Sequence, residues 1–206
     1  MRKLLAIMFV LGFAGMVALK ADETTSTNTL VWCGLDYSMA KMIGTTDFNE
    51  PGQIFPGALV EWNGLFMTEM LPKLEKMAPD LQTDLDGVRA KNEKATAKQI
   101  VREDGTMSEM VDATTITDKD IAHEVNSLPM KKEQGLGLVF IMDRLVKVQE
   151  RGCLYVVFFD IRTRKVVYSE RFVGKAGGFG FRNYWFRPVK DAVDKLPRMY
   201  RTAVNT

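Results

Sequence analysis

Three apolar runs in the last third of the chain dominate its hydrophobic pattern. They cover 136–142, 154–159 and 166–173, and turn-forming residues separate them. The runs are rich in β-branched and aromatic residues, and their short connections predict a meander of three antiparallel strands. Because the apolar positions are continuous instead of alternating, these strands are predicted to be covered on at least part of both faces.

Helical spacing marks three other segments. Residues 59–77 carry apolar side chains at steps of three and four, and Pro72 inside this segment predicts a kink or an early end. Thr117 followed by Asp120 resembles a capping box and predicts the start of a short helix. A further apolar stripe over 185–200 predicts a closing helix.

The closing helix contains two prolines. Pro188 falls in its predicted first turn, where the missing N–H costs little, and Pro197 is predicted to end or bend it. Residues 201–206 are predicted to form a frayed tail. With two more strands, at 30–35 and 98–102, the elements predict an α+β fold. Its single mixed, largely antiparallel sheet carries helices mainly on one face, and the meander and closing helix complete one domain over 29–200.

The N-terminus has the pattern of a secretory signal. Arg2 and Lys3 precede an apolar stretch, and cleavage is predicted after Ala21, which makes 1–21 the signal and 22–28 a flexible leader. An uncleaved anchor is the alternative. The product is predicted to be periplasmic or secreted. No cysteine lies at the cleavage site, since the first is Cys33, so a lipid anchor on a mature N-terminal cysteine is not expected. A transmembrane span is not expected after cleavage either.

Signal cleavage also changes the charge. The whole chain has a formal net charge of +2, and loss of Arg2, Lys3 and Lys20 lowers it to −1. A nearly neutral protein has no general electrostatic reason to bind nucleic acid. The mature chain is long enough for one domain with a substantial core.

Cysteine and histidine are scarce. Cys33 and Cys153 are the only cysteines, and export permits a disulfide between them, although two buried thiols fit their apolar surroundings equally well. His123 is the only histidine and falls within a charged helical segment, where a solvated surface position is expected. No metal site or cofactor is predicted.

The meander and the closing helix carry a resemblance to known envelope domains. The strings VVFFDIRTRKVVYSE and RPVKDAVDKL, within 135–196, are similar to the TolB amino-terminal domain, the curli-secretion lipoprotein and the lipoproteins that activate penicillin-binding proteins. Asp160, Thr163, Val166 and Tyr168 occupy the strand–turn–strand positions of that pattern. The resemblance implies a fold more than a function.

A second resemblance covers more of the C-terminal half. The strings GLGLVFIMDRL, VVFFDI and GKAGGFGFRNYW together resemble exported proteins of unknown function from Bacteroidetes-type bacteria. Two departures from the envelope lipoproteins matter. Arg164 stands where those domains more often have glycine, and no lipobox precedes the domain, so their membrane-tethered role is not carried over.

The glycine-rich stretch 174–185 is the most conspicuous candidate site. Glycines before a helix can bind an anion through bare N–H groups, with nearby cations assisting. The ligand-binding candidates are Lys175, Gly177, Gly178, Gly180 and Arg182. The glycine spacing matches neither nucleotide-binding motif, and the preceding strands are antiparallel. A structural junction between sheet and helix is therefore the favoured interpretation.

Three functions remain open from the sequence. The first is an exported, envelope-associated accessory protein that acts through protein contacts, without catalysis. Its predicted partner surface combines large apolar residues of the loop 37–57 with those of 179–187: Tyr37, Phe48, Phe55, Phe179 and Phe181. The second is a periplasmic protein that binds a small ligand or anion through 174–182. The third is a hydrolase that uses carboxylates at strand ends, Asp36, Asp143 or Asp160.

Overall fold

The computed structural model of the chain describes residues 29–44, 48, 53–94, 100–101 and 116–206. Its strands are β1 (Leu30–Asp36), β2 (Lys41–Ile43), β3 (Gln82–Thr83), β4 (Ile100–Val101), β5 (Leu136–Val146), β6 (Arg151–Asp160) and β7 (Val166–Lys175). Its helices are α1 (Leu59–Glu69), α2 (Leu71–Met77), α3 (Asp86–Asn92), α4 (Asp118–Ser127) and α5 (Gly180–Val204), and a short π-helical turn, η1 (Gln53–Ala58), precedes α1. The predicted signal and leader lie outside the described residues.

Strand β5 organises the sheet. β6 and β7 follow it in two long antiparallel ladders, which confirms the predicted meander. On its other edge β5 pairs in parallel with β1 and, further along, with β2, so these two strands lie end to end. β3 and β4 add short parallel pairings outside β1 and β2. The protein is therefore α+β with one mixed sheet, as predicted.

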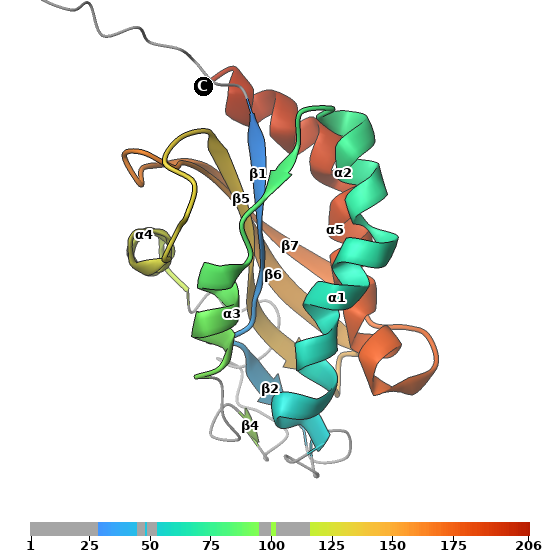
Figure 1. Cartoon of the computed structure of the whole chain (residues 1–206). Coiled ribbons are helices and arrows are strands. Elements are labelled where there is room, and N and C mark those ends of the chain that lie inside the picture. Colours follow the sequence, from blue (N-terminus) through green and yellow to red (C-terminus); the bar gives the residue numbers. More distant parts are fainter. Residues whose placement is uncertain (1–28, 45–47, 49–52, 95–99, 102–115) are drawn as a thin grey trace, which may run out of the picture.

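Helices cover the two faces of the sheet unequally (Figure 1). Helices α1, α2 and α5 pack on one face, here called the α5 face. Helices α3 and α4 pack on part of the other face, here called the α4 face. The main core lies on the α5 face, where Trp32 stacks on Phe66 with ring centroids 4.0 Å apart. The expectation of helices mainly on one face is confirmed.

Two glycines let α5 approach the sheet closely. Gly152 of β6 and Gly174 of β7 are cross-strand partners, and both lie beneath Pro188 of α5. A Cβ on Gly174 would lie 2.7 Å from Cα of Pro188, which is too close for any side chain. Gly174 therefore serves helix–sheet packing, in line with the structural interpretation of the glycine-rich stretch.

Proline has different effects in the two helical regions. The helical segment breaks at Met70, two residues before Pro72, as predicted. In contrast, α5 begins at Gly180, earlier than predicted, and continues through Pro197 to Val204. The prediction of a frayed tail from residue 201 is wrong for these last helical residues. Buried Leu196 and Met199 flank Pro197, and their packing holds the helix together across the missing hydrogen bond.

Candidate functional site

The glycine-rich stretch forms a tight junction between β7 and α5. The N–H of Ala176 donates to the carbonyl of Glu150 at 2.7 Å, and the N–H of Gly177 donates to the carbonyl of Tyr184 at 2.9 Å. Gly178 has φ 123° and Gly180 has φ 76°, a backbone region that favours glycine. These glycines therefore set the path of the turn, and one N–H proposed for anion binding already has a partner.

Arg182 ties the junction to α1. Its guanidinium lies 2.8 Å from a carboxylate oxygen of Glu61, and its backbone carbonyl accepts a hydrogen bond from Nε1 of Trp62 at 3.2 Å. Trp62 is fully buried, so this contact fixes the start of α5 against the core. A structural anchor accounts for Arg182 better than the predicted ligand contact.

Lys175 has no comparable anchor. It is exposed at the end of β7, directly opposite the exposed Arg151 of β6. Like charges directly opposite each other destabilise a strand pair. In the part of the chain that the structure describes, neither side chain makes an ion pair or a hydrogen bond. The opposition of Lys175 and Arg151 is therefore unfavourable, and no contact of either side chain offsets it within the described residues. Residues retained for function often carry such a local cost.

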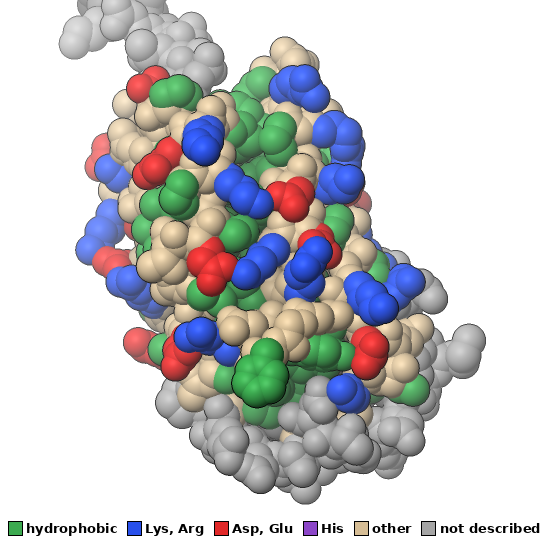
Figure 2. All heavy atoms as spheres, turned by 90° about the vertical axis from the view of Figure 1, so that its right-hand side faces the viewer, with side chains coloured by type: hydrophobic (Ala, Val, Ile, Leu, Met, Phe, Trp, Pro, Cys, Tyr) green, Lys and Arg blue, Asp and Glu red, His purple; other side chains and the backbone are tan. Residues whose placement is uncertain are grey.

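Apolar side chains are exposed around this junction. Phe179 is 95% exposed, and Val148, in the turn that bonds to Ala176, is 62% exposed. Phe181 is half-buried and packs edge-on against Phe48, with ring centroids 5.9 Å apart. We call Val148, Phe179 and Phe181 the junction patch. Figure 2 shows hydrophobic side chains gathered at this lower end of the face, below an area with many Lys and Arg side chains.

The other predicted partner-surface residues lie elsewhere. Tyr37 and Phe48 are buried in the main core, so the prediction that they form a surface is wrong. Tyr37 packs edge-on against Trp62, and the rings of Phe48 and Trp185 have centroids 5.4 Å apart. Phe55 belongs to η1, but its side chain is outside the described part.

The two cysteines are separate buried thiols, so the disulfide interpretation is wrong. Cys33 lies at the bulge of β1 beside β5, whereas Cys153 lies opposite Arg144 on the other edge of β5. Burial raises the pKa of each thiol to about 12, which keeps both protonated at neutral pH. They behave as small core residues.

A half-buried lysine joins three elements on the α4 face. The ammonium group of Lys91, on α3, contacts the carboxylate of Glu124 on α4 and lies 3.6 Å from Asp36 at the end of β1. It also donates to Oγ of Ser127 at 3.2 Å. Burial lowers the pKa of Lys91, and the Asp36 carboxylate partly opposes that shift. Because its ammonium group contacts acceptors on β1 and α4, Lys91 links these two elements to α3.

A second ionic cluster lies further along β5. Asp143 is at a bulge, where one of its carboxylate oxygens accepts from Nε and Nη2 of Arg144 at 3.0 Å, and the other lies 3.4 Å from Arg171 of β7. Asp143 is 2% exposed and Arg144 is completely buried. Asp160 accepts from the N–H and hydroxyl of Thr163 at 2.6 and 2.7 Å, as expected of a turn residue.

These contacts bear on the hydrolase alternative. Asp36 and Asp143 each have a cationic partner, and Asp160 pairs with Leu136 at the opposite end of β5 from Asp143. Asp160 holds its turn through Thr163, so each of the three carboxylates already has a partner within the protein. Sequence periodicity did not reveal either cluster, because each charge lies in an apolar strand or a polar helix and meets its partner only in the folded chain.

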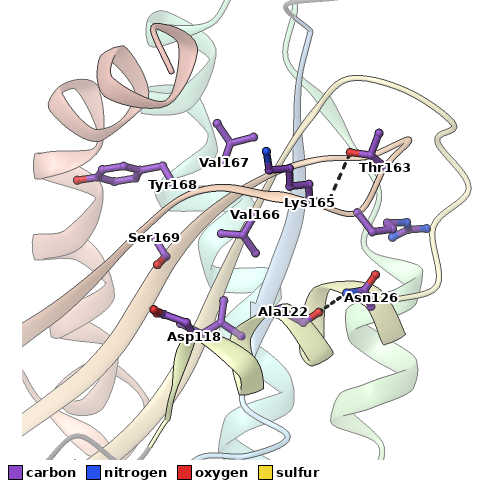
Figure 3. A pocket seen from close by; sticks show the side chains of 11 residues that line it. Asp118, Ala122, Asn126, Thr163, Lys165, Val166, Val167, Tyr168 and Ser169 are labelled. Carbon is purple, nitrogen blue, oxygen red and sulfur yellow. Dashed lines mark hydrogen bonds between the residues drawn. The ribbon is translucent and has the colours of Figure 1, made fainter.

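A groove runs between α4 and strand β7 (Figure 3). Its volume is about 500 Å³, and Asp118, Ile121, Val166 and Ser169 are among the residues that line it. Val166 and Ser169 point toward α4, whereas Tyr168 points away toward α5. Consecutive residues of β7 line the groove, so it follows the strand itself.

No protein-family model matches the chain, and no curated protein matches it. In the described ranges, no three His, Cys, Asp or Glu residues form a group that could hold a metal ion. The helices described here also include none that is long and apolar enough to cross a bilayer. The fold and the junction patch together describe the class of protein: an α+β domain that presents an ordered apolar patch.

Proposed function

We propose that the protein is an exported accessory protein of the cell envelope that binds another protein through the junction patch. The observation that carries the proposal is Phe179, which is almost fully exposed on a turn held by hydrogen bonds. The N-terminal secretory pattern supports the location, and the resemblance to envelope domains points to an accessory role.

The patch is prepared for binding because its surroundings are already ordered. Tyr184 packs on Trp185 at 5.2 Å, and the Lys147 ammonium lies 5.0 Å from the Tyr184 ring. An ordered turn loses little conformational entropy on association. Burial of a Phe side chain contributes about 1.5–3 kcal/mol, which is typical of an anchor residue.

The neighbouring charge suggests the chemistry of the partner. Lys147 supplies a positive charge beside the patch, and Arg182 supplies another that Glu61 partly neutralises. A partner with an apolar recess and acidic residues at its edge would complement Phe179 and these cations.

Photo-crosslinking in the cells that make the protein tests this function. A benzophenone amino acid replaces Phe179 in one variant and Val204 in a matched control, which is also exposed but lies in the last turn of α5. We expect a discrete protein adduct from position 179 that is absent from position 204. Val148→Glu, introduced into the position-179 variant, should reduce that adduct. Identical adducts from both positions, or none from position 179, would contradict the proposal.

A further inference from the structure

Strand β7 has a free edge in the described part of the chain. It is ten residues long, contains no proline and pairs only with β6 among the strands described. Residues 166–173 are partly exposed whichever face they point to. The N–H and C=O groups along such an edge can pair with another chain, and proteins usually cover or interrupt edges of this length.

We propose that this edge binds the same edge of a second copy of the chain. The two β7 strands would pair antiparallel about a two-fold axis normal to the sheet, which joins two sheets into one. In an isologous contact of this kind the same surface of both copies meets, so a side chain that needs a partner must find it on the same surface of the other copy.

The side-chain alternation of β7 limits the possible registers. Phe172 and Glu170 point to the α5 face, where Glu170 meets Arg198 of α5. Ser169 lines the groove on the α4 face, and by alternation Lys175 lies on that face too. Opposite residues of an antiparallel ladder share a face, so the axis must pass through a residue position, not between two.

Charge and the bulge then select one register. A two-fold axis at Glu170 or Arg171 would place two copies of that charged residue directly opposite each other. An axis at Val173 would place Arg171 opposite Lys175 of the other chain, and like charges in such positions are destabilising. An axis at Ser169 leaves only a short ladder, because Val167 is an extra residue at a bulge. An axis at Phe172 avoids like charges and pairs residues 169–175 in full.

The selected register gives Lys175 an ionic partner. Lys175 of one chain lies opposite Ser169 of the other, on the α4 face, where Asp118 lines the same groove as Ser169. Within the described residues, Asp118 also makes no ion pair. The symmetric contact forms this Lys175–Asp118 pair twice, and it explains why an exposed cation stands beside Arg151 at the end of β7.

Cysteine crosslinking of the purified, exported protein tests the register. Ser169→Cys and Lys175→Cys together place two thiols opposite each other across the interface, close enough for a disulfide. Within one chain the two positions are about 20 Å apart along the strand. We expect a reducible dimer from the double variant and none from either single variant. The native Cys33 and Cys153 are buried, so they serve as internal controls that should form no crosslink. No dimer from the double variant, or equal dimer from a single one, overturns the proposal.

Charge reversal tests the ionic contact separately. Lys175→Glu should raise the dissociation constant of the dimer about tenfold or more in sedimentation equilibrium, and Asp118→Lys in the same chain should restore it. Lys195→Glu, an equal charge change on the exposed side of α5, is the control and should leave association unchanged. Wild-type protein that stays a single chain at about 100 μM, or a double reversal that does not recover, overturns the proposal. Phe179→Ala should not affect the dimer, which separates this inference from the proposed function.

Discussion

Gly87 provides a sharp test of how α3 is held on the α4 face. It lies in the first turn of α3, and a Cβ at this position would overlap the carbonyl oxygen of Pro129. Gly64 of α1 is also helical, but its Cβ would meet nothing within 4 Å. Helix propensity alone predicts that Gly→Ala stabilises either helix by about 1 kcal/mol. Packing predicts opposite signs at the two positions.

The size of the effect at Gly87 follows from its surroundings. To admit a methyl group, the segment that contains Pro129 must move away from α3 by about 1 Å or more, and overpacking of that kind costs about 1–3 kcal/mol. The movement also strains two hydrogen bonds, at 2.7 and 2.8 Å, from the N–H groups of Lys131 and Lys132 to the Asp84 carboxylate. We therefore expect Gly87→Ala to destabilise the protein by roughly 2–4 kcal/mol in total.

Thermal unfolding followed by tryptophan fluorescence measures both variants. We expect Gly87→Ala to lower the melting temperature by roughly 4–16 °C, and Gly64→Ala to raise it by a few degrees. If Gly87→Ala were as stable as the wild type, the close approach of α3 and Pro129 would be wrong. If Gly64→Ala also destabilised, the effect would belong to glycine replacement in general and not to this contact.

Two further predictions concern the buried ionic and thiol groups. Asp143→Asn should destabilise by about 3–5 kcal/mol in urea unfolding, because Arg144 is fully buried, whereas Asp194→Asn at the exposed Lys73 pair should change stability by about 1 kcal/mol or less; equal effects would contradict a buried cluster. The pKa of each thiol is raised in the folded state, so its contribution to stability is complete below about pH 9 and is lost as the pH rises toward 12. Neither Cys33 nor Cys153 should react with iodoacetamide at pH 8 until the protein unfolds, and rapid labelling of native protein would refute their burial.

Sequence patterns correctly predicted the elements that depend on contacts between residues close together in the chain. The meander, the break near Pro72, the Thr117–Asp120 cap and the Asp160 turn each depend on neighbouring residues, and all are confirmed. The Thr117 hydroxyl accepts from the N–H of Asp120, whose carboxylate accepts from the N–H of Thr117. Such contacts form between residues three positions apart and leave a readable mark in sequence.

Long-range pairing explains what the sequence could not reveal. β2 is three residues long and β3 is two, and both exist because a longer neighbouring strand supplies their hydrogen bonds. The parallel pairing of β1 with β5 joins segments about one hundred residues apart, and no local signal specifies it. The same holds for the site: burial of Tyr37 and Phe48 depends on Trp62 and Trp185, which approach them only in the folded chain.

The junction between β7 and α5 serves three roles because neighbouring residues point in different directions. Gly174 faces α5 and admits Pro188, Lys175 lies on the opposite face, and Phe179 projects from the turn that follows. The proposed self-association uses the strand edge, and the proposed partner contact uses the turn, so the two do not compete. In an antiparallel dimer the two junctions lie at opposite ends of the shared ladder. Such a dimer presents two Phe179 patches at a fixed separation, so a partner with repeated sites would bind with an avidity that neither patch has alone.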